Sequence, residues 1–254
     1  IPVDPLSKEI SDGAAVLDGG VLHSYNPGWR FSAGEKNGFT IWQTQVNGYY
    51  RKYFDETDFN LGVATLRTGP VWVVPQSWSA SIGLQLDQIW LGNNRLGLFL
   101  TVNPTITWEL DPQSQLTASL EYTNPDYRKD EDNGRDGDLW RGNLGYSHLF
   151  GLGSVGIQAG VGFADFKAND NRFSYNGPEA FAGLTWNAWR TGVLYSSLNY
   201  RQFDFEGTDP LFGESRTDDE WRLITGIRQQ LGRTWALRCE WVYTNNNSNL
   251  DLFE

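Results

Sequence analysis

The chain has 254 residues, a formal net charge of −11, 28 Gly, 12 Trp and no Met. Its 15% of aromatic residues argue against disorder, and its glycine content argues against a helical bundle. The acidic balance argues against nucleic-acid binding, which requires a basic face, and the single cysteine, Cys239, excludes an internal disulfide.

Apolar and polar side chains alternate along nearly the whole chain, and turn residues interrupt the alternation at intervals. This period-two pattern predicts β-strands. No apolar run approaches the roughly 20 residues that a membrane-spanning helix needs. In chain order, we expect strands at 14–23, 28–35, 39–54, 59–70, 76–91, 95–110, 114–125, 137–149, 153–167, 173–188, 191–205, 217–231 and 233–245, with a fourteenth that begins near Asn249 and is cut off at Glu254. We interpret residues 1–12 as a periplasmic tail or linker and 13–254 as one β-domain.

The connections between these strands fall into two classes. Tight turns are expected at 111–113, 151–152, 189–190 and 232–233, and longer loops at 124–136, 168–172, 206–216 and 246–248. Because the two classes alternate, they lie at opposite ends of the sheet. Outer-membrane barrels have short periplasmic turns and longer external loops, and this arrangement would place both chain ends on the short-turn side.

Acidic residues concentrate at the end that we expect to be external. The windows 53–58, 124–138 and 203–220 together carry a net charge of −12, which leaves +1 for the rest of the chain. An acidic rim of this kind would attract divalent cations beside an anionic lipid surface. Solvated, charged loops are the alternative interpretation.

Alternation alone does not tell which face of a strand points inward, and aromatic placement helps to decide. On strand 233–245, Trp235, Leu237, Trp241 and Tyr243 share one face, with aromatic residues near both ends. Eight to ten tilted residues span roughly 20–25 Å, which matches the apolar band between the two aromatic girdles of a membrane barrel. The predicted fold is therefore an all-β, closed antiparallel transmembrane β-barrel of about 14 strands. A soluble β-protein is the alternative.

The opposite face carries charged residues that would then line the lumen. These lumen-lining candidates are Asp87, Glu109, Glu121, Arg141, Arg201, Arg222, Arg228, Arg238 and Glu240. They could form an ion-paired ladder that fills a narrow barrel, or a polar conduit whose arginines attract anionic cargo.

Catalytic and metal-binding patterns are weak. His23 and His148 each have an adjacent serine, but neighbouring residues in a strand point to opposite faces, so only a cross-strand partner could complete a nucleophile–base pair. We expect no catalytic residues and no cofactor. The acidic run at 130–138 contains weak calcium candidates, Asp130, Asp132, Asp136 and Asp138, although its spacing does not fit the helix-loop-helix calcium motif.

The C-terminal segments resemble a known family. Arg216-Thr217-Asp218-Asp219-Glu220-Trp221, Leu231-Gly232-Arg233 and Asn245-Asn246-Asn247-Ser248-Asn249-Leu250 are similar to the C-terminal barrel of outer-membrane proteins linked to tetratricopeptide repeats. The surface lipoprotein assembly modifiers are the family that they resemble most. The resemblance implies a fourteen-stranded barrel and a periplasmic repeat domain or partner.

Three functions remain open at this stage. The resemblance implies a translocation or surface-display module for lipoprotein or other secreted cargo. A polysaccharide exporter or a diffusive porin is the alternative, and a lipid-modifying outer-membrane enzyme is a third hypothesis. The expected location is the bacterial outer membrane, with membrane lipid and lipopolysaccharide as partners and no nucleic acid.

Overall fold

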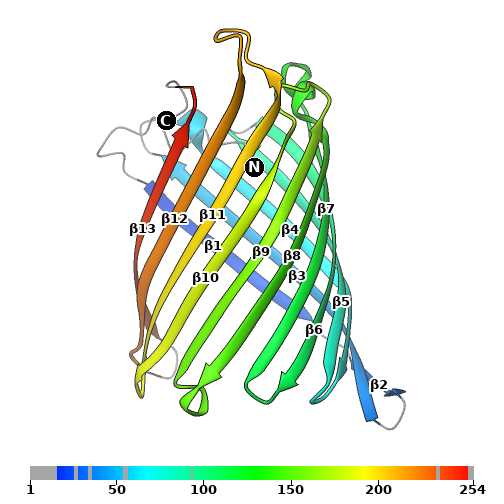
Figure 1. The fold of residues 1–254 in the computed structure, drawn as a ribbon, viewed down its shortest axis with the longest axis vertical. Helices are drawn as coiled ribbons and strands as arrows, with labels where there is room; N and C mark the ends of the chain where they lie inside the picture. The colour runs from blue at the N-terminus through cyan, green and yellow to red at the C-terminus, as the bar shows by residue number, and fades with distance from the viewer. Residues whose placement is uncertain are drawn as a thin grey trace.

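The fold is seen in a computed structural model that describes residues 16–25, 28–33, 36–53, 57–92, 94–232 and 235–250. Its regular elements in these ranges are antiparallel strands and short 3₁₀ helices, which Figure 1 shows as a tilted, curved wall. The elements are β1 (Val16–Tyr25), β2 (Gly28–Ala33), β3 (Lys36–Tyr53), η1 (Thr57–Phe59), β4 (Leu61–Val74), β5 (Trp78–Leu91), β6 (Asn94–Asp111), β7 (Ser114–Tyr127), η2 (Asp130–Arg135), β8 (Gly137–Phe150), η3 (Gly151–Gly153), β9 (Val155–Ala168), β10 (Tyr175–Trp189), β11 (Gly192–Thr208), β12 (Ser215–Gln230) and β13 (Ala236–Ser248). Within the described ranges, no helix has the length and apolarity that crossing a membrane requires.

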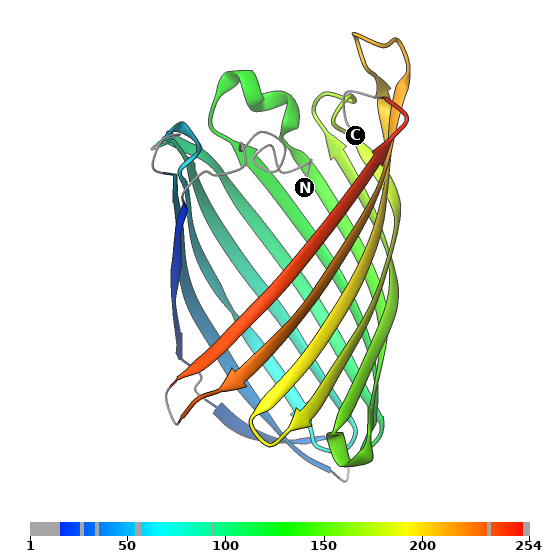
Figure 2. The same ribbon diagram turned by 90° about the vertical axis from the view of Figure 1, so that its left-hand side faces the viewer.

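The strands form one antiparallel sheet in the order β1-β3-β4-β5-β6-β7-β8-β9-β10-β11-β12-β13, with β2 beside β3. Almost every strand pairs with its neighbours in sequence, as in a simple meander. Figure 2 shows this sheet wrapping around a central space. The strand order ends at β1 on one side and β13 on the other, and the described residues contain no pairing between these two strands.

The count of fourteen strands is wrong for the described residues, which contain thirteen. Two expected strands, 14–23 and 28–35, are also not successive neighbours in the sheet. β1 pairs with β3 from Val16↔Tyr53 to Tyr25↔Thr44, and β2 continues the same register from Gly28↔Ile41 to Ala33↔Lys36. The two described pieces therefore lie along one edge of β3 in a shared register, and residues 26–27 lie outside the described residues.

The expected fourteenth strand is not observed either. Asn249 and Leu250 form a bend, and residues 251–254 lie outside the described residues, as does the expected tail at 1–12.

The two ends of the sheet differ largely as the sequence predicts, but the long loop expected at 246–248 is wrong, because β13 continues to Ser248, and the connection at 92–93 is short. At one end, short connections lie at 75–77, 112–113, 151–154 and 190–191, and at the other, longer ones lie at 128–136, 169–174 and 209–214. Figure 1 shows η2 and the β11–β12 loop at the upper, long-loop end. The expectation that both chain ends lie at the short-turn end is wrong for the described chain. β1 begins beside Tyr53 and β13 ends at Ser248, both at the long-loop end, because the strand order holds an even number of strands.

The outer face is apolar and exposed. On β8, Arg141 and Asn143 line an inner cavity, so the alternating residues Leu144 and Tyr146 point outward, where they are 48% and 41% exposed. The same parity holds on other strands, and the large exposed apolar side chains include Leu66, Leu84, Leu100, Leu120, Val161, Phe163, Leu184, Leu198 and Trp241. An apolar wall of this extent is rare on soluble monomers and is typical of a surface that faces lipid.

Aromatic side chains border this apolar wall at both ends. At the long-loop end, the ring centroids of Tyr122 and Trp140 lie 4.8 Å apart, and those of Tyr200 and Trp221 lie 4.6 Å apart. At the short-turn end, Trp78 pairs across the strands with Trp108. Two such girdles mark the interfaces between hydrocarbon and water in transmembrane barrels.

Candidate functional site

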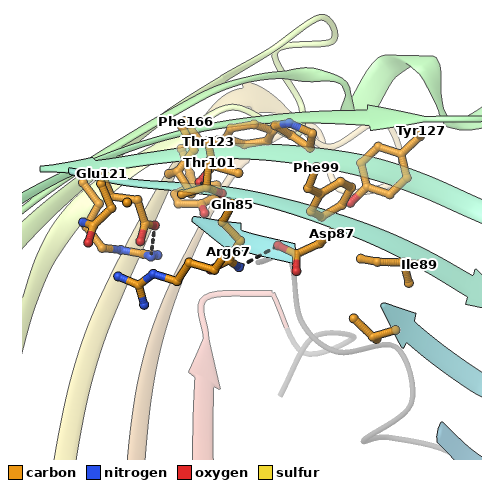
Figure 3. Close-up of a pocket in the computed structure, with 17 residues that line it drawn as sticks. Arg67, Gln85, Asp87, Ile89, Phe99, Thr101, Glu121, Thr123, Tyr127 and Phe166 are labelled. Atoms are coloured by element: carbon orange, nitrogen blue, oxygen red, sulfur yellow. Dashed lines mark hydrogen bonds and ion pairs between the residues drawn. The ribbon is translucent and has the colours of Figure 1, made fainter. Parts of the chain in front are cut away.

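A cavity of about 380 Å³ lies against the inner face of the sheet and receives side chains from β4 to β10 (Figure 3). Each strand contributes alternate residues, because successive side chains of a strand point to opposite faces. The lining residues are Val63, Arg67, Gly83, Gln85, Asp87, Ile89, Phe99, Thr101, Asn103, Glu121, Thr123, Pro125, Tyr127, Leu139, Arg141, Phe166 and Tyr175.

One side of this cavity is aromatic. Phe99 and Tyr127 meet edge to face with their ring centroids 5.4 Å apart, and Phe166 and Tyr175 lie at the same centroid distance. Tyr175 also packs on Phe203, which lies at 5.0 Å. We call the buried group Leu139, Ala164, Phe166, Tyr175, Phe203 and Phe205 the inner aromatic cluster. These residues lie near the long-loop ends of their strands, so the core of the protein is inside the barrel wall at that end.

The other side of the cavity carries an ion-pair network centred on Arg141. Its Nη1 lies 3.0 Å from Glu121 Oε1, and its Nε lies 3.1 Å from Glu179 Oε2. Arg201 Nε lies 3.7 Å from the other oxygen of Glu179. The Arg141 and Glu179 side chains are only 17% and 12% exposed, so the pairing offsets a real desolvation cost.

Asp87 is held by neutral hydrogen-bond donors. Thr65 Oγ1 donates to Asp87 Oδ1 at 2.5 Å, and Gln85 Nε2 donates to Asp87 Oδ2 at 2.7 Å. Next to it, the guanidinium group of Arg67 lies over Gly83, where an added Cβ would be 3.2 Å from Arg67 Nε. Figure 3 shows Arg67 extending toward Glu121.

A second cavity of about 410 Å³ adjoins the first. It shares the lining residues Glu121 and Arg141 and adds Glu179, Phe181 and Arg201 among others. The Arg141 network therefore stands between two inner cavities, which is the position of a constriction.

The structure distributes the nine lumen-lining candidates along the inner face. Asp87, Glu121, Arg141 and Arg201 surround the two cavities just described. Arg228 lines a separate cavity of about 510 Å³ near the short-turn end. Arg238 pairs with Glu240 and donates from Nε to the Tyr195 hydroxyl at 3.0 Å. Glu109 and Arg222 occupy positions of the same parity on β6 and β12 but line none of these cavities.

Sequence reasoning missed Arg67, Glu179 and the aromatic residues that point inward. Arg67 and Glu179 occupy alternate positions on the same inner face as the predicted residues, so the alternation could have identified them. The aromatic residues were missed because every apolar side chain was expected to face lipid. Their signal is a break in the pattern: Phe99 stands between Leu98 and Leu100, and Phe203 and Phe205 alternate with polar residues.

The calcium candidates that the structure describes, Asp132, Asp136 and Asp138, each bind a protein group. No group of three or more metal-binding side chains occurs in the ranges that the structure describes. Asp136 Oδ1 accepts the Tyr127 backbone N–H at 2.6 Å, Asp138 Oδ1 accepts the Tyr122 hydroxyl at 2.5 Å, and Asp132 pairs with Arg135. These carboxylates serve the β7–β8 loop, while the Asp130 side chain lies outside the described residues.

His148 does have a cross-strand partner. Ser114 on β7 pairs with His148 on β8, and Ser114 Oγ lies 2.8 Å from His148 Nδ1. The Tyr146 hydroxyl donates to the same Ser114 oxygen at 3.3 Å. Ser114 is only 4% exposed, so its hydroxyl is enclosed by these side chains at the short-turn girdle. The side chains of His23 and Ser24 lie outside the described residues.

Comparisons with known proteins place these features in context. A family profile described as outer membrane protein beta-barrel domain matches residues 98–252, more than half of the chain. The solved structure of the CymD monoaromatic hydrocarbon channel is similar with a TM-score of 0.50 and 9% identity, covering 92% of this chain and 84% of that chain. The NanC porin structure has a TM-score of 0.49 and 9% identity, covering 83% of this chain and 100% of that chain. A search of curated proteins found no match.

Proposed function

This chain belongs to the outer membrane protein β-barrel family of the bacterial outer membrane, and on that premise we propose that it is a narrow channel for small solutes. The observation that carries the proposal is the pair of inner cavities separated by the Arg141 network. Channels select solutes by pore width and by the charges and hydrogen-bonding groups along the wall. This inner wall combines a constriction with charged and hydrogen-bonding side chains.

The size of the inner space supports a small solute over a folded or polymeric cargo. The cavities measure about 380 and 410 Å³, which is in the range of sites for single small molecules. The inner aromatic cluster also fills part of the inner face at the long-loop end. The similar fold of a monoaromatic hydrocarbon channel is consistent with a wall that mixes aromatic and polar residues.

The proposal includes a closed wall in the membrane. An open sheet edge in hydrocarbon would leave backbone N–H and C=O groups without partners, at a cost of several kcal/mol each. We therefore propose that the free edges of β1 and β13 are covered when the protein is in the bilayer. We also propose that the acidic long-loop end faces outward toward lipopolysaccharide.

Planar-bilayer recording tests the channel function. The folded protein should give small, steady single-channel currents, because the Arg141 network leaves a narrow path. Glu179→Gln should change the preference for anions over cations, since it removes one carboxylate from the constriction. Glu214→Gln, in the β11–β12 loop away from these cavities, is the matched control. A protein that inserts but passes no ions, with wild-type and variants alike, would contradict the proposal.

The translocation and surface-display function implied by the resemblance stays a prediction, as does a periplasmic repeat partner. Its own test is surface exposure of a lipoprotein in cells with and without this chain. The sequence predicts no catalytic residues, and labelling of Ser114 by a serine-directed lipase probe would instead support the third hypothesis, a lipid-modifying enzyme.

A further inference from the structure

The first inner cavity has a charged group, Arg67, and a separate aromatic side, and together these indicate a class of solute. We propose that this cavity binds a small organic carboxylate with an aromatic or alkyl body, with the carboxylate on Arg67 and the apolar body against Phe99, Tyr127 and Phe166. The inference rests on the proposed function in that it names the solute of the same cavity.

The charge balance of the lining singles out Arg67. Asp87 accepts from Thr65 and Gln85, and Glu121 and Arg141 pair with each other. Of the four charged side chains of this lining, all within the described ranges, Arg67 alone has no ion pair or side-chain hydrogen bond. It is also exposed to the inner space. A guanidinium group offers five donors in a planar fork that fits a carboxylate with two parallel hydrogen bonds.

The local backbone gives this guanidinium group its place. Arg67 and Gln85 are directly opposite on β4 and β5. Gly83, two residues before Gln85, presents no side chain on this face, and a Cβ there would lie 3.2 Å from Arg67 Nε and Nη2. The missing side chain therefore leaves room for the guanidinium group over the strand, in the wall of the cavity.

The aromatic side fits the remainder of such a solute. Phe99, Tyr127, Phe166 and Tyr175 present ring surfaces to a space of about 380 Å³. An apolar cavity of roughly 150 Å³ already accepts a benzene ring, so this space can hold a ring together with a short acid chain. A purely ionic solute would leave the aromatic surface in contact with water, and a hydrocarbon would leave Arg67 without an anion.

Binding of phenylacetate tests the inference directly. Isothermal titration calorimetry would compare phenylacetate, phenylacetamide and acetate on the folded barrel in lipid nanodiscs, with empty nanodiscs as the reference. We expect phenylacetate to bind about tenfold more tightly than either of the other two, because each lacks one half of the contact.

Two arginine variants locate the site. Arg67→Gln should weaken phenylacetate binding about tenfold, whereas Arg228→Gln, an inner-face arginine that lines a different cavity, should leave it unchanged. Phe99→Leu should weaken phenylacetate more than acetate. Equal affinity for the acid and its amide, or equal losses in both arginine variants, would overturn the inference.

The outcome separates this inference from the channel proposal. A protein that conducts ions but binds phenylacetate no better than acetate keeps the channel and loses the solute class. A protein that binds phenylacetate through Arg67 but conducts nothing keeps the binding site and loses the channel.

Discussion

Removal of Arg141 should destabilise the barrel more than removal of an exposed arginine. The Arg141→Met substitution keeps much of the side-chain volume and deletes the charge-assisted bonds to Glu121 and Glu179. Glu179 keeps its ion pair with Arg201 at 3.7 Å, so Glu121 loses more electrostatic stabilisation than Glu179 does. Each such bond contributes about 1.5–3 kcal/mol, and a deeply buried carboxylate left alone costs about 3–5 kcal/mol. Because the carboxylates are 12–29% exposed, we expect a loss of about 2–3 kcal/mol.

Urea unfolding of the barrel in lipid vesicles, followed by tryptophan fluorescence, measures this loss. Arg128→Met is the matched control, because Arg128 pairs with Asp126 at 3.6 Å with both side chains about half exposed, and such pairs contribute about 1 kcal/mol or less. Adding Glu121→Gln to Arg141→Met should restore part of the stability. If Arg141→Met costs no more than the control, the network does not support the inner wall.

Three further predictions concern the backbone, the loop and the outer face. Gly69→Ala should lower the free energy of unfolding by about 1–3 kcal/mol. Gly69 has φ +156°, and an added Cβ would lie 1.9 Å from the Ile82 carbonyl oxygen. Gly48→Ala is the control and should be tolerated, because an added Cβ there meets nothing within 4 Å. Hydrogen bonds from Arg172 hold the pKa of Asp170 below its usual 3.8. Any stability that this loop contact adds is thus complete above the pKa of Asp170 in the unfolded chain and is lost as the pH falls through its lower pKa in the folded protein. In a carboxyl NMR titration, Arg172→Gln should raise the titration midpoint of Asp170. An unmoved midpoint would count against the contact. Leu144→Arg should cost about 2–4 kcal/mol if this outward residue faces the middle of the bilayer, and an unchanged urea midpoint would argue against lipid there.

Much of the wall could be predicted from the alternation of apolar and polar residues. A shift of one residue along a strand would move every side chain to the opposite face, so the pattern must be kept strictly and is easy to recognise. The expected strand at 95–110 appears as β6 (Asn94–Asp111), and the expected strand at 137–149 appears as β8 (Gly137–Phe150). The edge at β1 and β2 could not be predicted in the same way. The segment between the expected strands 14–23 and 28–35 looks like a turn in sequence, but the register that β1 and β2 share with β3 places both described pieces along one edge.

The site was harder to predict than the wall. Asp87, Glu121 and Arg141 could be named from the sequence because charged residues at inner parity are distinctive, and all three line the first inner cavity. Phe166 and Tyr175 were not found, since every apolar side chain was expected to face lipid, and only a break in the alternation, as at Phe99, marks an inward aromatic residue. The partners of Arg141 also depend on which strands are adjacent: Glu179 is 38 residues away in sequence and two strands away in the sheet.

The central claim is that the apolar face meets lipid and the polar face meets an aqueous interior. Two adjacent residues on β8 test it, in a Cys239→Ser background: Asn143→Cys, on the inner face, and Leu144→Cys, on the outer face. With the barrel folded in lipid vesicles, a charged, water-soluble thiol reagent should label the cysteine at position 143 and leave the one at position 144 unreacted. Labelling at 144 with protection at 143 would contradict the account.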